Sequence, residues 1–102
     1  MNELNPLEQA VYDLIPRGFE NKRVFKELNA HLERRSFDHI ISALRKKGKV
    51  IGAVRGKHGG YFVATNEEER GIALQQLEAQ LKTEMRIVAA MKVSELETVE
   101  SI

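Results

Sequence analysis

The side chains with the clearest chemistry in this sequence are cations that gather near its middle. Between residues 34 and 58 stand eight basic residues and a single acid, Asp38. Lys and Arg bind phosphate groups through charge and hydrogen bonds, so this excess predicts a surface for a polyanion. Charge alone leaves a hydrated basic face as the alternative. The eight residues are Arg34, Arg35, Arg45, Lys46, Lys47, Lys49, Arg55 and Lys57.

The charge is divided unevenly along the chain. Residues 1–64 hold 12 Lys and Arg against 7 Asp and Glu, a net charge of +5. Residues 65–102 hold 4 against 8, a net charge of −4, so the overall +1 conceals two regions of opposite sign. We therefore expect the polyanion surface in the first two thirds and a different role for the last third.

The sequence offers little for catalysis or metal binding. Cysteine is absent, which excludes disulfides, thiolate ligands and Cys nucleophiles. None of the three histidines stands in a His-x-x-x-His pair or at ligand spacing from a carboxylate. Ser36, Asp38, His39 and Ser42 are too close on one helix to converge as a triad. We expect no catalytic residue, no metal and no cofactor.

The composition is that of a globular protein, with 42% hydrophobic and 30% charged residues. Its apolar runs are far shorter than the roughly 20 residues that cross a bilayer. The acidic start MNELNPLEQ differs from a signal peptide. These features predict a cytoplasmic location.

Three short helices are expected in the first half of the chain. The first spans residues 6–15, with Asn5 as N-cap, Pro6 at the first helical position and Glu8 closing a capping box. The second is capped by Asn21, and the third begins between residues 33 and 36 and ends at Gly48. The side chains expected to face inward are Leu7, Ala10, Val11, Leu14, Ile15, Val24, Phe25, Leu28, Phe37, Ile40, Ile41 and Leu44.

Beyond Gly48 the pattern changes from helical to extended. Residues 50–54 and 61–64 are β-prone and flank the glycine-rich segment RGKHGG, which predicts a β-hairpin with a basic tip. Thr65 or Asn66 then caps a helix over residues 67–92, whose first turn carries three Glu residues.

Three helices followed by a hairpin are typical of a winged helix-turn-helix, an α+β and mostly helical fold in which the third helix enters the DNA major groove. We expect Arg35 and His39 to contact base edges, with Asp38 and Ser42 beside them. Arg34 and Ser36 complete the recognition helix. The residues expected mostly on phosphates are Arg45, Lys46, Lys47 and Lys49, in and after the helix. The hairpin tip is the wing, where Arg55 and Lys57 would neutralise phosphate or enter the minor groove, with His58 beside them.

The last helix carries an apolar stripe at spacings of three and four residues. It is too long to lie wholly on a domain of about 64 residues, so we expect it to pair with a second copy in a homodimer. DNA half-sites would then be related by a dyad. The alternative is that residues 72–85 pack on their own domain in a monomer. The stripe comprises Leu74, Leu77, Leu81, Met85, Val88 and Met91.

The stretch from IPRG (residues 15–18) through ISALRKKG (41–48) to GGYFVATNEEE (59–69) resembles phage and prophage winged-helix proteins of Gram-positive bacteria. The resemblance covers about residues 7–92. It implies double-stranded DNA binding through residues 34–47 and the hairpin 50–64, in a replication or regulatory gene region. The added helix is similar to that of the dimeric MarR-like and PadR-like regulators. ERRSFDHI replaces the Ser or Thr cap followed by Arg-Thr-Val that is common in such families.

The predicted organisation is a DNA-binding domain over residues 1–64, a dimerisation helix over 65–92 and a flexible acidic tail over 93–102. Transcription regulation and replication-region binding both remain open, with a replication or transcription protein as a further partner and no membrane. The alternative from another class is an adaptor that uses the winged scaffold and its last helix to bind a protein.

Overall fold

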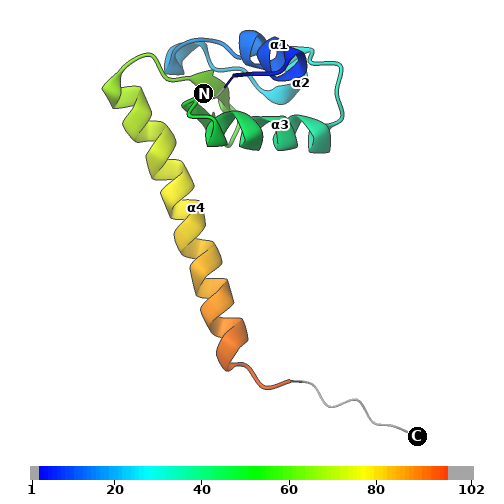
Figure 1. Ribbon diagram of the computed structural model, residues 1–102. Helices are drawn as coiled ribbons and strands as arrows, with labels where there is room; N and C mark the ends of the chain where they lie inside the picture. Colours follow the sequence, from blue (N-terminus) through cyan, green and yellow to red (C-terminus); the bar gives the residue numbers. More distant parts are fainter. Residues whose placement is uncertain (1–2, 97–102) are drawn as a thin grey trace, which may run out of the picture.

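The computed structural model describes residues 3–96 and is an α+β, mostly helical structure. Figure 1 shows a folded unit from which one long helix extends outward. The elements in chain order are α1 (Pro6–Leu14), η1 (Phe19–Asn21), α2 (Phe25–Leu28), α3 (Arg34–Lys46), β1 (Ile51–Val54), β2 (Gly60–Val63) and α4 (Glu67–Val93). No helix in the described range is long and apolar enough to cross a membrane.

Helix α1 begins with the predicted capping box. The Asn5 side chain accepts a hydrogen bond from the Glu8 backbone N–H at 2.7 Å, and the Asn5 N–H donates to the Glu8 carboxylate at 2.9 Å. Its predicted apolar stripe is only partly correct. Val11 and Ile15 are buried, but Leu7 and Leu14 are 51% and 42% exposed, and Ala10 is exposed as well. The apolar pattern did not predict the burial of Glu8, which forms an ion pair with Lys47.

The segment between α1 and α2 differs from the expectation that Asn21 caps the second helix. Residues 22–24 are extended because Arg23 exchanges two backbone hydrogen bonds with Tyr61, of 3.1 and 2.7 Å. This leaves α2 to begin at Phe25, while Asn21 ends η1 and its side-chain amide donates to the Arg17 carbonyl. The segment is thereby attached along β2.

Helix α3 supplies the centre of the core, as its period predicts. Phe37 and Leu44 are 0% exposed, and Ile40 and Ile41 are also buried. The helix ends where the sequence indicates, since Gly48 takes a φ of 90°, which glycine adopts without strain. The other buried members of this core are Val11, Ile15, Leu28, Ile51, Tyr61 and Val63.

The hairpin is predicted to within one residue and has two different faces. Its antiparallel register pairs Ile51 with Val63 and Gly52 with Phe62. Ile51 and Val63 belong to the α3 core, whereas Phe62 packs edge-on against Phe19 with ring centroids 5.4 Å apart. A Cβ at Gly52 would lie 2.3 Å from the Phe62 ring, so that ring lies directly over the glycine.

Helix α4 is one residue longer than predicted and is capped by Asn66, whose side chain accepts from the Glu69 N–H at 2.8 Å. Its first turns contact β1, and Ala73 is 2% exposed there. Every residue of 78–96 is exposed. In Figure 1 the helix extends past the level of α3, on the side away from α1 and α2. Residues 97–102 of the predicted tail lie outside the described range.

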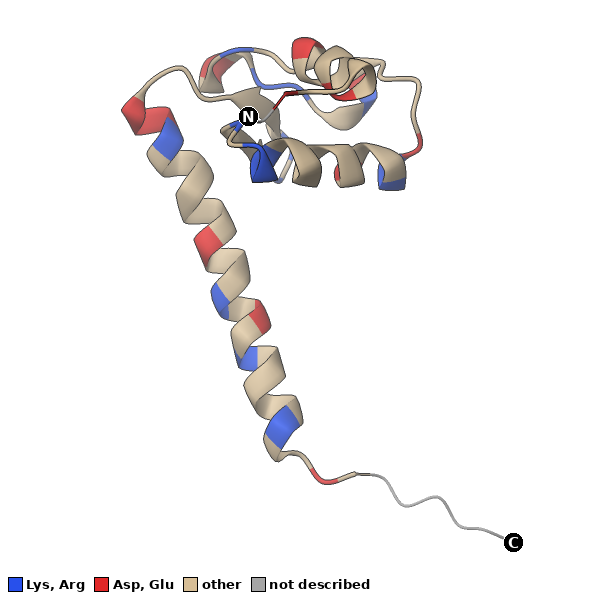
Figure 2. Cartoon of the chain, viewed as in Figure 1, with Lys and Arg blue, Asp and Glu red and all other residues tan. Residues whose placement is uncertain are grey.

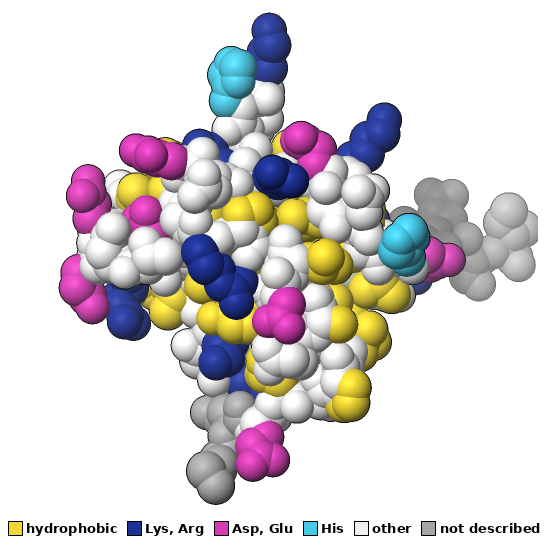
Figure 3. All heavy atoms as spheres, turned by 90° about the horizontal axis from the view of Figure 1, so that it is seen from above, with side chains coloured by type: hydrophobic (Ala, Val, Ile, Leu, Met, Phe, Trp, Pro, Cys, Tyr) yellow, Lys and Arg dark blue, Asp and Glu magenta, His cyan; other side chains and the backbone are white. Residues whose placement is uncertain are grey.

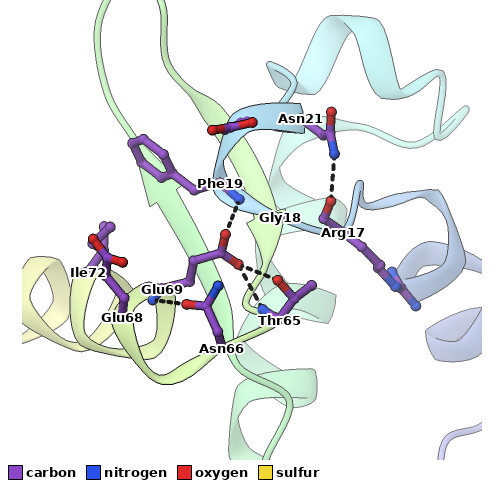
Figure 4. A pocket seen from close by; sticks show the side chains of 10 residues that line it. Arg17, Gly18, Phe19, Asn21, Thr65, Asn66, Glu68, Glu69 and Ile72 are labelled. Carbon is purple, nitrogen blue, oxygen red and sulfur yellow. Dashed lines mark hydrogen bonds between the residues drawn. The ribbon is translucent and has the colours of Figure 1, made fainter.

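One carboxylate fastens the start of α4 to the folded unit. Glu69 accepts hydrogen bonds from the Phe19 N–H at 3.0 Å and from the Thr65 N–H and hydroxyl at 2.8 and 2.9 Å (Figure 4). The Phe19 N–H, and then the Thr65 N–H, lower the pKa of this carboxyl. Glu69 therefore joins η1, the end of β2 and α4 through a single charge.

Substituting Glu69→Gln should lower the melting temperature by several degrees, because an amide is a weaker acceptor than a carboxylate for these donors. Thermal unfolding followed by circular dichroism would measure it. Glu68→Gln is the matched control, since it removes the same charge from the same helical turn at an exposed side chain. Equal melting temperatures for the two variants would contradict the role assigned to Glu69.

Candidate nucleic-acid interface

The outer face of α3 carries a line of exposed polar side chains. Arg35, His39, Ser42 and Lys46 follow one another at spacings of four, three and four residues, which places them on one helix face. The line is about 16 Å long at 1.5 Å per residue. Within the described chain none of these side chains makes a hydrogen bond or ion pair, so all four are available to a partner. We call them the α3 stripe.

The first turn of α3 adds positive potential to this face. Glu33 occupies the N-cap position without a side-chain hydrogen bond, and the turn contains Arg34 and Arg35 but no acid. The other two long helices differ, because α1 and α4 both begin with a side-chain cap and carry Glu in the first turn. Cations at the positive end of a helix dipole are unfavourable in isolation and favour an anion nearby.

Arg34 and Asp38, two of the predicted site residues, are held together by Tyr61. The Arg34 guanidinium donates to the Tyr61 hydroxyl at 3.0 Å and to the Asp38 carboxylate at 3.2 Å. The Tyr61 hydroxyl lies 3.3 Å from the same carboxylate oxygen. The bond to Asp38 raises the pKa of Arg34, and burial, then Asp38, raises the pKa of Tyr61. The contact of Tyr61 with these two residues could not be predicted from the sequence, because β2 and α3 come together only in the folded chain.

Arg45 and Lys47 also contact their own chain rather than projecting from it. The Arg45 guanidinium donates to the Ile51 carbonyl at 2.9 Å, and burial lowers its pKa. The Lys47 ammonium forms an ion pair with the buried Glu8 carboxylate and donates to the Glu3 carbonyl at 3.1 Å. These contacts join α3 to β1 and to α1. The phosphate contacts expected of both residues stay a prediction, but each side chain already has a structural role.

The hairpin tip presents the remaining predicted cations. Arg55, Lys57 and His58 are exposed and have no hydrogen-bond partner in the described chain, whereas the Lys49 ammonium lies 5.0 Å from the centre of the Tyr12 ring. The tip turns tightly, with the Gly59 N–H donating to the Gly56 carbonyl at 3.0 Å. A narrow basic loop of this kind can approach a sugar-phosphate backbone.

The charges on the rest of the surface are mixed. Figure 2 shows Lys and Arg at both ends of α3 and alternating charge signs along α4. The face that carries α1 and α2, seen in Figure 3, has acids and cations interspersed with open hydrophobic side chains.

The described residues contain no group of three or more His, Asp or Glu side chains that could hold a metal ion. The hollow between η1 and the start of α4 is lined by Glu69 and its hydrogen-bond partners, by the further acids Glu20 and Glu68, and by the apolar side chains of Phe19 and Ile72 (Figure 4).

Comparison with known proteins found no matching family model, no similar curated protein and no similar solved structure. The geometry of α3, the hairpin and α4 is therefore the basis for assigning a function.

Lys47→Gln should destabilise the protein because it leaves the buried Glu8 carboxylate without its cation. Lys46→Gln, at an exposed position without a described partner, is the matched control and should leave the melting temperature unchanged. Chemical or thermal unfolding of the two variants would show the difference.

The loss at position 47 should depend on pH. Lys47, and then the Asn5 N–H, lower the pKa of Glu8 below the ordinary 4.5, so the stabilisation is complete above that value. It is lost as the pH falls through the lowered pKa of the folded state. The melting temperatures of the wild type and Lys47→Gln should therefore converge in acid. A constant difference would exclude this ion pair as the cause.

Proposed function

We propose that this chain is a winged helix-turn-helix protein that binds double-stranded DNA sequence-specifically as a homodimer. The single observation that carries the proposal is the α3 stripe, a line of unpaired DNA-competent side chains opposite the buried face of the same helix. Helix α3 is the recognition helix, α2 and the turn before α3 complete the helix-turn-helix, and the hairpin is the wing.

The backbone around α3 supports this proposal. Helix α2 is followed by a turn in which Asn29 and His31 have φ values of 52° and 54°, and α3 begins at Arg34. The left-handed residues reverse the chain sharply, which helix-turn-helix motifs require. The hairpin follows α3 directly, and Arg23 pairs with Tyr61 on its inner strand. This is the element order that winged proteins use to bind a duplex.

The dimensions of α3 suit the major groove. A helix of 10–12 Å diameter fits a groove about 12 Å wide, where base edges present distinct donors and acceptors. Arg35 can donate two hydrogen bonds to guanine, and His39 and Ser42 can contact the next base edges along the stripe. Lys46, at the far end, and Lys57, on the wing, then neutralise phosphates.

Helix α4 limits where the duplex can run. Because α4 extends past the level of α3, a duplex on the outer face of α3 would pass beside it (Figure 1). The exposed residues of α4 include Leu74, Leu81, Met85, Ile87, Val88 and Met91, each at least 47% exposed. An isolated helix with this much exposed apolar surface has marginal stability in water. The exposed surface therefore supports pairing of α4 with a second copy.

The biological role that we propose is a phage-type transcription regulator or a replication-region binding factor in the cytoplasm. Both roles use the same duplex contacts. They differ in the partner recruited, since a replication factor would contact a helicase or its loader. Crosslinking to such a protein on DNA would separate them.

The exposed leucines of α1 favour a second candidate, an adaptor that binds a protein partner. Leu7 and Leu14 of α1 are 51% and 42% exposed. The face of the molecule that carries α1 and α2 shows open hydrophobic side chains in Figure 3. An adaptor does not need the α3 stripe. Retention of full activity by stripe variants in the cell would therefore favour the adaptor over the DNA-binding protein.

Arg35→Ala should weaken binding to a preferred duplex by about 1–3 kcal/mol if Arg35 donates to guanine, with little loss on unrelated sequences. Lys57→Ala should instead weaken binding to all duplexes equally and reduce the dependence on salt. Anisotropy titrations at several salt concentrations would measure both effects. Lys82→Ala, which removes one exposed charge from α4, is the control and should change neither. Unchanged affinity in both test variants would contradict the proposed interface.

Leu81→Asp combined with Val88→Asp should give monomers of 11.6 kDa by sedimentation, because the two copies together would lose four apolar side chains from the seam and gain four charges there. Leu81 and Val88 are both exposed in a single copy, so the folded unit of each variant chain should keep its structure. Ala79→Asp combined with Ala89→Asp is the matched control, with the same two charges on positions outside the stripe. A wild-type mass in the test variant would exclude α4 as the dimer interface.

A further inference from the structure

The outer part of α4 has no packing partner among residues 3–96. Residues 78–93 are all exposed, although they continue an unbroken helix. Helices of this length are only marginally stable alone in water, and their stability in proteins comes from burying an apolar face. The proposed self-association explains how this segment is stabilised but does not say in which direction the two helices run.

The stripe on α4 follows a heptad pattern with one interruption. Leu74, Leu81 and Val88 recur every seven residues, and Leu77 and Met91 occupy the second core position of the repeat. The position between them is Glu84, which is exposed. A carboxylate in the seam decides between the two orientations.

A parallel pair in register would be unfavourable. It would place each Glu84 against Glu84 of the partner, so that two like charges face each other in the seam. The parallel pair would also place Glu78 level with the partner's Glu78. Glu78 would then lie away from every basic residue of the opposite helix. Neither Glu78 nor Lys92 has an ion-pair partner within the described chain.

An antiparallel pair removes both problems. From this placement we infer that two copies pair through antiparallel α4 helices, with the two-fold axis near Arg86. Leu81 then packs against the partner's Met91, and Glu84 lies beside the partner's Val88 instead of another carboxylate. Glu78 and Lys92 occupy the same flanking position of the repeat, so each Glu78 meets the partner's Lys92. The inference rests on the dimer proposed above but not on DNA binding.

The arrangement places the two folded units at opposite ends of the helix pair. Nineteen residues separate the start of α4 from the axis, so the two starts stand about 57 Å apart at 1.5 Å per residue. The apolar residues at 81, 88 and 91, which are 50–71% exposed in one copy, are covered by the second. Leu74 and Leu77 lie nearer the folded unit than the end of the partner's α4, which stops at Val93.

Disulfide crosslinking tests the orientation directly, because the natural chain has no cysteine. Leu81→Cys and Met91→Cys are prepared separately and oxidised alone and as an equimolar mixture. In the antiparallel pair the two residues at position 81 lie about 15 Å apart along the axis, too far for a disulfide. Only the mixture should therefore give crosslinked dimers on a non-reducing gel.

Three results would overturn the inference, and they differ in meaning. Efficient crosslinking of each variant alone would show a parallel pair and leave the dimer standing. No crosslink from a protein that sediments as a dimer would exclude this pairing of positions 81 and 91 and leave the dimer standing. A monomeric wild-type mass would remove the dimer itself, whereas DNA binding would still be judged by the titrations of α3 and wing variants.

A charge exchange gives an independent measurement. Glu78→Lys should weaken dimerisation several-fold by placing two lysines together, and adding Lys92→Glu should restore it. Lys82→Glu, on the outer side of the helix, should leave the dimer dissociation constant unchanged. Failure of the double variant to recover would contradict the pairing of Glu78 with Lys92.

Discussion

The burial of one face of α3 is the interaction on which the rest of the structure depends. Phe37, Ile40, Ile41 and Leu44 fix this helix against α1, α2 and the hairpin, and Phe37 and Leu44 are completely buried. Each buried side chain of this size contributes about 1.5–3 kcal/mol relative to exposure, so the helix cannot rotate about its axis without a large loss. The opposite face, with the α3 stripe, is therefore held outward in a fixed orientation.

The cations of the chain divide into two groups with different roles. Arg34, Arg45 and Lys47 are attached to Tyr61, Ile51 and Glu8, and they fix α3 relative to the hairpin and α1. Arg35, Lys46 and Lys57 have no such contacts in the described chain and form the proposed binding surface. Net charge does not distinguish the groups. Only the direction in which each side chain is held does so, and that direction follows from the packing of α3.

Much of the fold could be predicted from the sequence because its signals are local. The capping box at Asn5, the period of α3, the glycine-rich hairpin and the Asn66 cap each depend on residues close together in the chain. The contacts that were missed join distant residues. Examples are the Arg23 pairing that shortens α2, the ion pair between Glu8 and Lys47, and the hydrogen bond from the Phe19 N–H to Glu69. The number of buried residues in α1 was overestimated, because the spacing of hydrophobic residues does not show how many of them the neighbouring elements cover.

The central claim is that the α3 stripe and the wing bind one duplex together. The most direct test is a ¹⁵N-¹H correlation titration of the wild-type protein with a duplex selected from a random pool, at low ionic strength. Chemical-shift changes should concentrate in residues 34–46 and 55–59, with the backbone of α1 and η1 little affected. Changes confined to the α1 face, or no changes at a duplex excess, would contradict it.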